Sequence, residues 1–340
     1  MIKKFIKYSK NFEDIQQLKK DFFKSNLAFI KKNNKIISYL KKQQKRKYCK
    51  NCNKRLDNKV DFVSHKLGYK ICKTCSHLNS IFEDNKNFHN KIYQLDKFSY
   101  SNSYKGDFIK RVENIYAPKA QFLIDFLKKK KIKNFKVLDF GCGCGHFVKA
   151  LQKKRVQAKG LETNEIMIKT GKKYLNKDSL ILSKNFEESL EIMKKNNYTV
   201  VSLLSVLEHL ENPNKILENF KLSKNKYLYI SIPLFSFSVF IEKIFQNIYP
   251  RHTAATHPHL YTYKSIKFIL KKYRLKICGE WWFGSEMMDL NRSFLLSMKK
   301  NQSKNLETKF NSVFTKLIND LQKVFDRNKL SSEVHLLIGK

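Results

Sequence analysis

Short apolar runs alternate with longer amphipathic stretches along the chain from residue 136 onward. Five of the runs read as buried strands, at residues 137–140, 158–161, 180–182, 199–204 and 227–232, and two more follow at 275–278 and 333–338. The stretches between the first five strands have the spacing of helices. Strands that alternate with helices in this way indicate βαβ units. We therefore expect an α/β fold with a Rossmann-like, doubly wound and mainly parallel sheet.

The first 116 residues have a different pattern. Residues 1–47 contain no Pro or Gly and carry apolar side chains at mostly helical spacing, among them Phe5, Ile6 and Ile15, so one or two basic amphipathic helices are expected there. Residues 48–116 hold a cysteine-bearing segment and an aromatic-rich connector. Residues 117–340 would form the main domain, with a helical insert at about 287–331 before its last strand.

The composition favours a folded protein without a membrane span. Of the 340 residues, 42% are hydrophobic, which is enough for a core and argues against disorder throughout. The longest stretch without a charged residue, 227–241, contains Ser and Pro and is shorter than the ~18 to 20 apolar residues that cross a bilayer. Residues 1–10 lack the apolar stretch of a secretory signal. The expected compartment is the cytoplasm.

The chain has 69 basic and 29 acidic side chains, a formal net charge of +40. Such an excess suits a nucleic acid or another anionic partner, because Lys and Arg contacts to phosphates release counterions. However, only 8 of the basic residues are Arg, which is the better residue for specific phosphate and base contacts. The charge is also spread out, with +12 in residues 1–47 and +28 in the other 293. The pattern favours a solvated, lysine-rich surface over a nucleic-acid interface.

A glycine-rich loop follows the first strand of the alternating region. The segment Val-Leu-Asp-Phe-Gly-Cys-Gly-Cys-Gly-His-Phe uses Gly141, Gly143 and Gly145 to connect a strand to a helix. Glycines let the chain turn tightly and bring backbone N–H groups close to a ligand at a helix start. Asp139 precedes the loop, and Glu162 ends the next strand, where an acidic side chain can accept both hydroxyls of a ribose. The combination indicates a nucleotide-type cofactor, with a packing turn in another nucleotide-binding fold as the alternative.

These segments resemble the class I S-adenosylmethionine-dependent methyltransferases over residues 120–277, and so does Val-Leu-Glu-His-Leu-Glu-Asn-Pro at 206–213. The resemblance implies S-adenosylmethionine (SAM) as the cofactor. It would be held by Asp139 and the loop at Gly141, Gly143 and Gly145 (methionine part), Glu162 (ribose), and Asn185 and Phe186 (adenine), with Ser205 beside the sulfonium. For the pair at 185–186, a plain helix start is the alternative.

The resemblance also suggests where an acceptor would lose its proton. Glu208 and His209 follow the fourth strand of the alternating region, and ligands of such sheets lie at the carboxyl ends of the strands. His257, His259 and Tyr261 occur after the fifth strand, where this family often places substrate residues. We expect catalytic roles for Glu208, His209 and His259, and substrate contacts from His257, His259 and Tyr261. In many relatives a similar Glu-His pair is structural, which is the alternative for Glu208 and His209.

Four cysteines precede the sheet with the spacing C-x2-C-x19-C-x2-C. They are Cys49, Cys52, Cys72 and Cys75. Two such knuckles suit tetrahedral thiolate coordination of zinc, and a set of four protein ligands leaves no open position, so a structural zinc-ribbon-like module is expected. Two disulfides are the alternative, which a reducing compartment disfavours.

A zinc knuckle followed by such a domain is similar to a group of bacterial methyltransferases that act on sugar nucleotides and surface-glycan precursors. The leading expectation is therefore a methyltransferase for a small anionic acceptor such as a nucleotide-linked sugar. The alternatives are an RNA methyltransferase that grips phosphates with the zinc module and the basic helices, and a module that binds the cofactor without catalysis. The methylated atom and the oligomeric state stay open.

Overall fold

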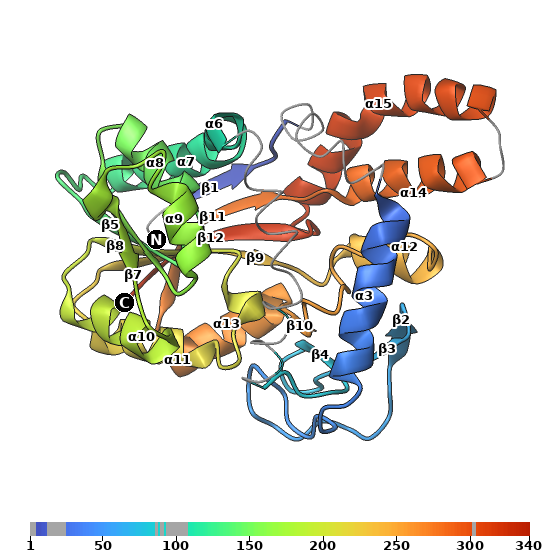
Figure 1. Cartoon of the computed structure of the whole chain (residues 1–340), viewed down its shortest axis with the longest axis horizontal. Coiled ribbons are helices and arrows are strands. Elements are labelled where there is room, and N and C mark those ends of the chain that lie inside the picture. The colour runs from blue at the N-terminus through green and yellow to red at the C-terminus, as the bar shows by residue number, and fades with distance from the viewer. Residues whose placement is uncertain (1–4, 12–24, 86–87, 89–91, 93–107, 301–303) are drawn as a thin grey trace.

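The computed structural model describes residues 5–11, 25–85, 88, 92, 108–300 and 304–340. Its centre is an eight-stranded sheet in the order β1-β11-β12-β9-β8-β5-β6-β7 (Figure 1). These strands are β1 (Phe5–Tyr8), β5 (Lys136–Phe140), β6 (Gln157–Glu162), β7 (Leu180–Leu182), β8 (Val200–Leu204), β9 (Tyr227–Pro233), β11 (Lys276–Phe283) and β12 (Glu333–Gly339). Only β12 runs antiparallel to its neighbours in this sheet, so the expected mainly parallel α/β sheet is confirmed.

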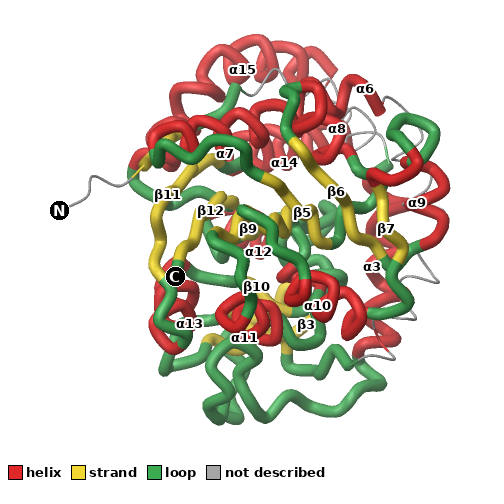
Figure 2. The backbone as a smooth tube through the Cα atoms, turned by 90° about the vertical axis from the view of Figure 1, so that its left-hand side faces the viewer, coloured by secondary structure: helices red, strands yellow, loops and turns green. Residues whose placement is uncertain are grey.

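Helices cover both faces of the sheet (Figure 2). One face packs against α7 (Ala117–Lys129), α8 (His146–Lys153) and α9 (Glu165–Gly171), through buried side chains such as Phe126 and Leu151. The other face packs against α10 (Phe186–Lys195), α11 (Asn214–Leu222) and α13 (Tyr263–Lys272). The result is the doubly wound, three-layer arrangement that the alternating pattern predicted.

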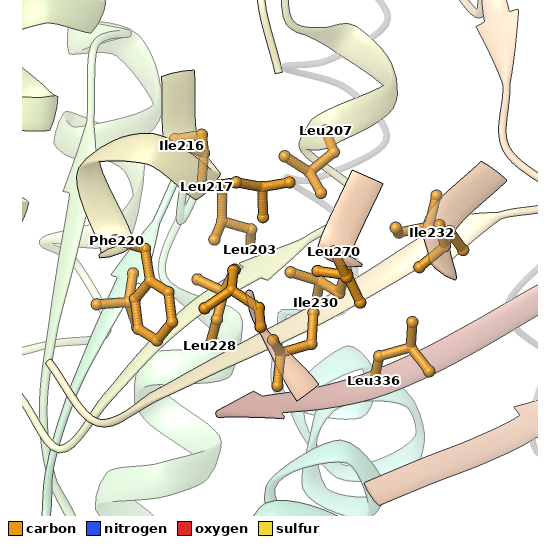
Figure 3. Close-up of a cluster of buried hydrophobic side chains, with 14 of the residues drawn as sticks. Leu203, Leu207, Ile216, Leu217, Phe220, Leu228, Ile230, Ile232, Leu270 and Leu336 are labelled. Atoms are coloured by element: carbon orange, nitrogen blue, oxygen red, sulfur yellow. The ribbon is translucent and has the colours of Figure 1, made fainter. Parts of the chain in front are cut away.

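Figure 3 shows buried side chains that lie between the sheet and the helices on its second face. Leu203 on β8, Ile230 on β9 and Leu336 on β12 belong to one buried cluster with Phe220 on α11 and Leu270 on α13, and all five side chains are at most 3% exposed. Burying a Leu, Ile or Phe side chain is worth about 1.5–3 kcal/mol each. Such continuous apolar strands occur where both faces of a parallel sheet are covered, and the apolar runs in the sequence have this origin.

The expected helix at the start of the chain is wrong for residues 5–8, which form the edge strand β1. This strand pairs in parallel with β11, and its burial alternates along Phe5, Ile6, Lys7 and Tyr8. The Phe5 ring packs on Phe122 with ring centroids 5.3 Å apart. A run this short fits the spacing of a helix as well as that of a strand. The strand forms because it can pair with the otherwise unpaired edge of β11. Expected helical positions between residues 12 and 24 lie outside the described residues.

The cysteine-bearing segment builds a second, four-stranded sheet in the order β10-β4-β3-β2. Its strands are β2 (Phe62–Ser64), β3 (Leu67–Ile71), β4 (Leu78–Ser80) and β10 (His259–Leu260). The last of these follows β9 and helix α12 (Phe237–Ile244) in the chain, so the main domain completes the small sheet. Helix α3 (Asn26–Leu40) packs its buried residues Ile36, Ile37 and Leu40 against this sheet. We call residues 44–85 the cysteine module. Part of the aromatic connector, 93–107, lies outside the described residues.

The remaining helical segments are α6 (Phe108–Arg111), η2 (Val112–Tyr116), η3 (Lys177–Ser179), η4 (Leu207–His209), α12 (Phe237–Ile244), α14 (Glu286–Lys300) and α15 (Lys304–Arg327). Helices α14 and α15 lie between β11 and β12 and extend side by side away from the sheet (Figure 1). Trp281 and Trp282 on β11 are buried in the core. Among the described helices, none combines the length and the apolar character that crossing a bilayer requires.

Candidate functional site

A cleft of about 1630 Å³ opens at the carboxyl ends of β5, β6, β7 and β8. The loops that follow these strands form one side of it. Residues of the cysteine module, among them Arg46, Tyr48 and Lys50, line the same cleft. Since sites for one small molecule usually measure about 300–1,000 Å³, the cleft has room for two small ligands side by side.

The glycine loop brings bare backbone to this cleft. Gly141, Gly143 and Gly145 have φ values of +70°, +55° and +78°, in the left-handed region that favours glycine. A Cβ at Gly145 would lie 2.6 Å from Leu175 Cδ1, and one at Gly141 would lie 2.9 Å from Val206 Cγ2. Around Gly143, no atom of the described residues other than Gly143 and its two neighbours in the chain lies within 4 Å of the Cβ position. The loop therefore offers a ligand close approach at its middle glycine.

Glu162 crosses from the end of β6 to this loop. Its Oε2 accepts a hydrogen bond of 2.9 Å from the Gly143 N–H, and its Oε1 accepts bonds of 2.8 and 3.0 Å from the N–H groups of Thr163 and Asn164. These bonds fix the carboxylate at the cleft wall. Oε1 also accepts a 3.4 Å bond from the Thr163 hydroxyl, whereas Oε2 has one donor for its two acceptor positions and keeps capacity for a hydroxyl donor. Its placement fits a ribose diol.

Asp139 lies on β5 at the inner end of the cleft. It is 3% exposed, and its Oδ1 accepts a 2.7 Å hydrogen bond from the Ser202 hydroxyl. Burial raises the pKa of this carboxyl to about 7, against the opposing effect of the Ser202 bond. A positively charged group placed beside Asp139 would favour the ionised form, because it would offset the burial.

Replacing Asp139 with asparagine is expected to change how stability depends on pH. The native carboxyl keeps its proton up to about pH 7, whereas an unfolded Asp loses it near pH 4. The native state therefore binds more protons in this window, and the free energy of unfolding of the wild type falls as the pH rises. The free energy of unfolding of Asp139→Asn, taken relative to that of the wild type, should rise by about 2–4 kcal/mol from about pH 5 to pH 8, as measured by thermal unfolding. An equal difference at both pH values would contradict the raised pKa, and the exposed Asp178→Asn is the control.

The other three expected cofactor residues also line the cleft. Ser205 has a φ of +57°, a strained value for serine, and its N–H donates to the Ser231 hydroxyl over 3.0 Å. Asn185 caps α10, since its side chain accepts from the Glu188 N–H over 2.9 Å. The Phe186 ring lies edge-on to Phe140 with centroids 6.0 Å apart. The helix-start interpretation of Asn185 therefore describes its local role, while Phe186 offers an apolar surface to the cleft.

Glu208 and His209 meet His257 beside the cleft. One ligand atom from each of the three lies within 4.8 Å of the others, although the loops that carry them are far apart in sequence. The rings of His209 and His257 have centroids 4.9 Å apart, and His209 lines the cleft. Burial raises the pKa of Glu208 to about 8 and lowers the pKa of His257 to about 4. We call these three residues the Glu-His-His cluster.

His259 and Tyr261 lie elsewhere. Both are buried, at 0% and 4% exposure, and neither is among the residues that line the cleft. His259 is in β10, its Nδ1 lies 3.0 Å from Nε2 of His77 in the cysteine module, and the Tyr261 ring packs edge-on against His77. These contacts join the module to the main domain, which the sequence expectation of a substrate pocket did not include.

The four cysteine side chains gather at one point of the module. Their sulfur atoms all lie within 4.8 Å of one another, with Cys49 to Cys75 at 3.7 Å and Cys52 to Cys72 at 3.6 Å. The Asn79 side-chain amide donates to Cys49 Sγ. A set of four thiol groups with an N–H donor fits zinc, which takes thiolate ligands in a tetrahedron and is tuned by such outer hydrogen bonds.

The residues that the sequence reasoning missed come from the start of the cysteine module. Arg46 and Lys50 line the cleft, and both form ion pairs with the buried Asp84. Their only signal in the sequence is their position beside the first knuckle. Seven basic side chains line the cleft, namely Arg46, Lys50, Arg111, Lys119, Lys184, Lys215 and Lys272, and seven acidic ones do so as well. The cleft is therefore far less basic than the chain as a whole.

Comparisons with known proteins point to one family. A family model described as a methyltransferase domain matches residues 108–278, which is half of the chain. No curated protein matches the chain.

Solved structures also resemble the chain. A SAM-dependent methyltransferase from Archaeoglobus fulgidus is 20% identical, with a TM-score of 0.44, over 72% of this chain and 99% of its own. A putative sarcosine dimethylglycine methyltransferase from Galdieria sulphuraria is 14% identical, with a TM-score of 0.44, over 66% of this chain and 85% of its own. Magnesium protoporphyrin IX methyltransferase from Synechocystis is 16% identical, with a TM-score of 0.45, over 59% of this chain and 94% of its own. These similarities are too low to inform about the acceptor.

Proposed function

The chain belongs to the methyltransferase-domain family and is a SAM-dependent methyltransferase, and we propose that it methylates a small anionic acceptor such as a nucleotide-linked sugar. The observation that carries this proposal is the shared cleft. The glycine loop and Glu162 line it together with residues of the cysteine module. A cofactor on the loop side leaves space for an acceptor against the module.

The residues of the loop side fit SAM. We propose that Glu162 holds the ribose, that the backbone around Gly143 and the carboxylate of Asp139 hold the methionine part, and that Phe186 packs on the adenine. The bound cofactor would supply a methyl group that is already activated for transfer. The protein then has to align the acceptor, exclude water and remove a proton from a hydroxyl or carbon acceptor. The Glu-His-His cluster is the group we propose for the last task.

Charge supports an anionic acceptor once the cofactor has been placed. Asp139 and Glu162 would contact the cofactor, so the rest of the cleft has seven basic and five acidic side chains. Lys184 and Lys272 are among the exposed cations of this remaining part. A modest positive excess suits one or two phosphates of a small molecule, whereas it would add little to the binding of a long polyanion.

We also propose that the four cysteines bind a structural zinc ion. Its role would be to keep the module folded at the acceptor side of the cleft, because among the described residues the apolar cluster at this point contains only Leu56 besides the cysteines. A small sheet of short strands needs such support. No step of the reaction runs through this ion.

Methylation assays with nucleotide sugars and total RNA test the acceptor. Labelled SAM is expected to transfer its methyl group to a component of a nucleotide-sugar fraction, with activity that changes less than about threefold between 50 and 200 mM salt. The exposed lysines at 31, 35, 41 and 42 favour the alternative, an RNA methyltransferase. Such an enzyme would label RNA, and its affinity for RNA would fall by about 10³-fold or more over that salt range. Label in RNA alone would overturn the proposed acceptor class.

A further inference from the structure

One buried carboxylate beside the cleft, that of Glu208, has an oxygen atom that makes no hydrogen bond, as do Glu286 and Asp326 among the described residues. Glu208 is 2% exposed, and its Oε2 has no hydrogen-bond partner among the described residues. Buried polar groups in proteins are nearly always paired, so an exception calls for an explanation. Glu208 lies in η4, four residues after the end of β8 and three after Ser205.

Glu242 is a buried carboxylate that does not line the cleft and accepts hydrogen bonds on both oxygens. Its Oε1 accepts from the N–H groups of Arg251 and His252 over 2.7 and 2.8 Å, and its Oε2 accepts from the N–H and the hydroxyl of Thr253 over 2.8 Å each. The His252 side chain, whose Nδ1 lies 3.1 Å from Oε1, and these bonds together outweigh the burial and lower the pKa of Glu242 to about 2. Glu208 has been given no comparable set of donors, although it is equally enclosed.

Two histidines complete the surroundings of Glu208. His257 Nδ1 is also buried and has no hydrogen-bond partner among the described residues. His209 Nε2 lies 4.0 Å from Glu208 Oε1. The other ring nitrogen of His209, Nδ1, lies 3.2 Å from the carbonyl oxygen of Thr256, to which it can donate. Such a bond places the proton on Nδ1 and the lone pair on Nε2, as in metal-binding histidines whose second nitrogen donates to a carbonyl.

We propose that Glu208, His209 and His257 bind a divalent cation of the zinc type at the edge of the cleft. Two imidazoles and one carboxylate form the ligand set of catalytic zinc sites, which keep a further position for water or substrate. The three ligand atoms already lie within 4.8 Å of one another, and small movements bring them to the ~2.0–2.2 Å that zinc requires. The cation would give a binding partner to both Glu208 Oε2 and His257 Nδ1, the two buried atoms that make no hydrogen bond.

This inference rests on the proposed function and makes it more specific. His209 lines the cleft, so the open position of the cation would face the acceptor. A hydroxyl of the acceptor bound there would have a lowered pKa and could pass its proton to water in the cleft. The acceptor class would then be an alcohol, as found on sugars, because a hydroxyl both binds a cation through oxygen and needs this activation.

Zinc content of the purified full chain tests the proposal. After saturation with Zn²⁺ and dialysis, elemental mass spectrometry should find a second equivalent of zinc in the wild type, beyond the one bound by the cysteines. Glu208→Gln and His257→Ala should each bind this second equivalent more than about 100-fold more weakly, because loss of a direct ligand exceeds the ~10–100-fold cost of losing an outer partner. Glu208→Gln keeps the shape of the side chain. The matched control Glu211→Gln, a cleft residue of the same loop, should keep both equivalents.

Calorimetric binding of S-adenosylhomocysteine, measured on the same samples, separates the two levels of the proposal. Binding of the nucleoside by a wild type that takes up only one zinc ion, or equal zinc content in all four proteins, would overturn the cation site and leave the methyltransferase assignment intact. Absence of nucleoside binding in a wild type that takes up both ions would instead overturn the proposed cofactor site.

Discussion

Replacing Cys72 with serine is expected to release the zinc ion and to unfold the cysteine module. In the proposed site the zinc-bound thiolates would contribute most of the module's stability, because a structural zinc site in a small module supplies folding free energy directly. We expect a loss of about 4 kcal/mol or more for the module, the range that follows removal of a metal or another key element. Zinc content and chemical unfolding followed by tyrosine and tryptophan fluorescence measure it.

Cys278→Ser is the matched control for this experiment. Cys278 is partly exposed on β11, outside the four-cysteine cluster, so its replacement should leave the zinc content unchanged. Unaltered zinc in Cys72→Ser would contradict the proposed ligand set. Because residues of the module line the cleft, Cys72→Ser should also lose methyl transfer while it still binds S-adenosylhomocysteine, provided that the main domain stays folded.

Replacing Glu162 with alanine is expected to weaken SAM binding by about 100-fold or more. Two hydrogen bonds from ribose hydroxyls to a carboxylate are worth about 1.5–3 kcal/mol each, and every 1.4 kcal/mol is tenfold in affinity. In the wild type the Gly143 N–H donates to this carboxylate. The substitution removes that hydrogen bond, so the glycine loop should be less well ordered. Calorimetric titration with S-adenosylhomocysteine measures the affinity, and thermal unfolding of the free protein measures the loop effect.

Two further variants separate these contributions. Glu162→Gln keeps the size of the side chain but replaces one acceptor oxygen with a donor, and it should bind with intermediate affinity. Glu165→Ala removes an exposed carboxylate three residues away, which does not line the cleft, and should bind like the wild type. Equal affinity of Glu162→Ala and the wild type would remove Glu162 from the cofactor site.

The parallel core could be predicted from the sequence because its strands are buried on both faces. A run such as 227–232 has no competing interpretation once helices flank it. The observed strand β9 agrees with this predicted range to within one residue. The glycine loop was equally readable, since its three left-handed residues accept only glycine without strain. Local conformation and tertiary packing agree at these positions.

Other features depend on contacts between distant segments, which a single sequence does not encode locally. Strand β1 exists because β11 offers a free edge more than 270 residues away. His259 and Tyr261 are buried because β10 completes the sheet of the cysteine module. The Glu-His-His cluster likewise joins two loops, and the sequence placed its three members in the site without showing that they meet.

The most direct test of the account is a calorimetric titration of the wild-type chain with S-adenosylhomocysteine. A cofactor site built from Asp139, the glycine loop and Glu162 predicts one binding site per chain with micromolar affinity, and a rise in the melting temperature that grows with the ligand concentration. No heat of binding and no thermal shift at high micromolar ligand, with folded and zinc-loaded protein, would contradict it.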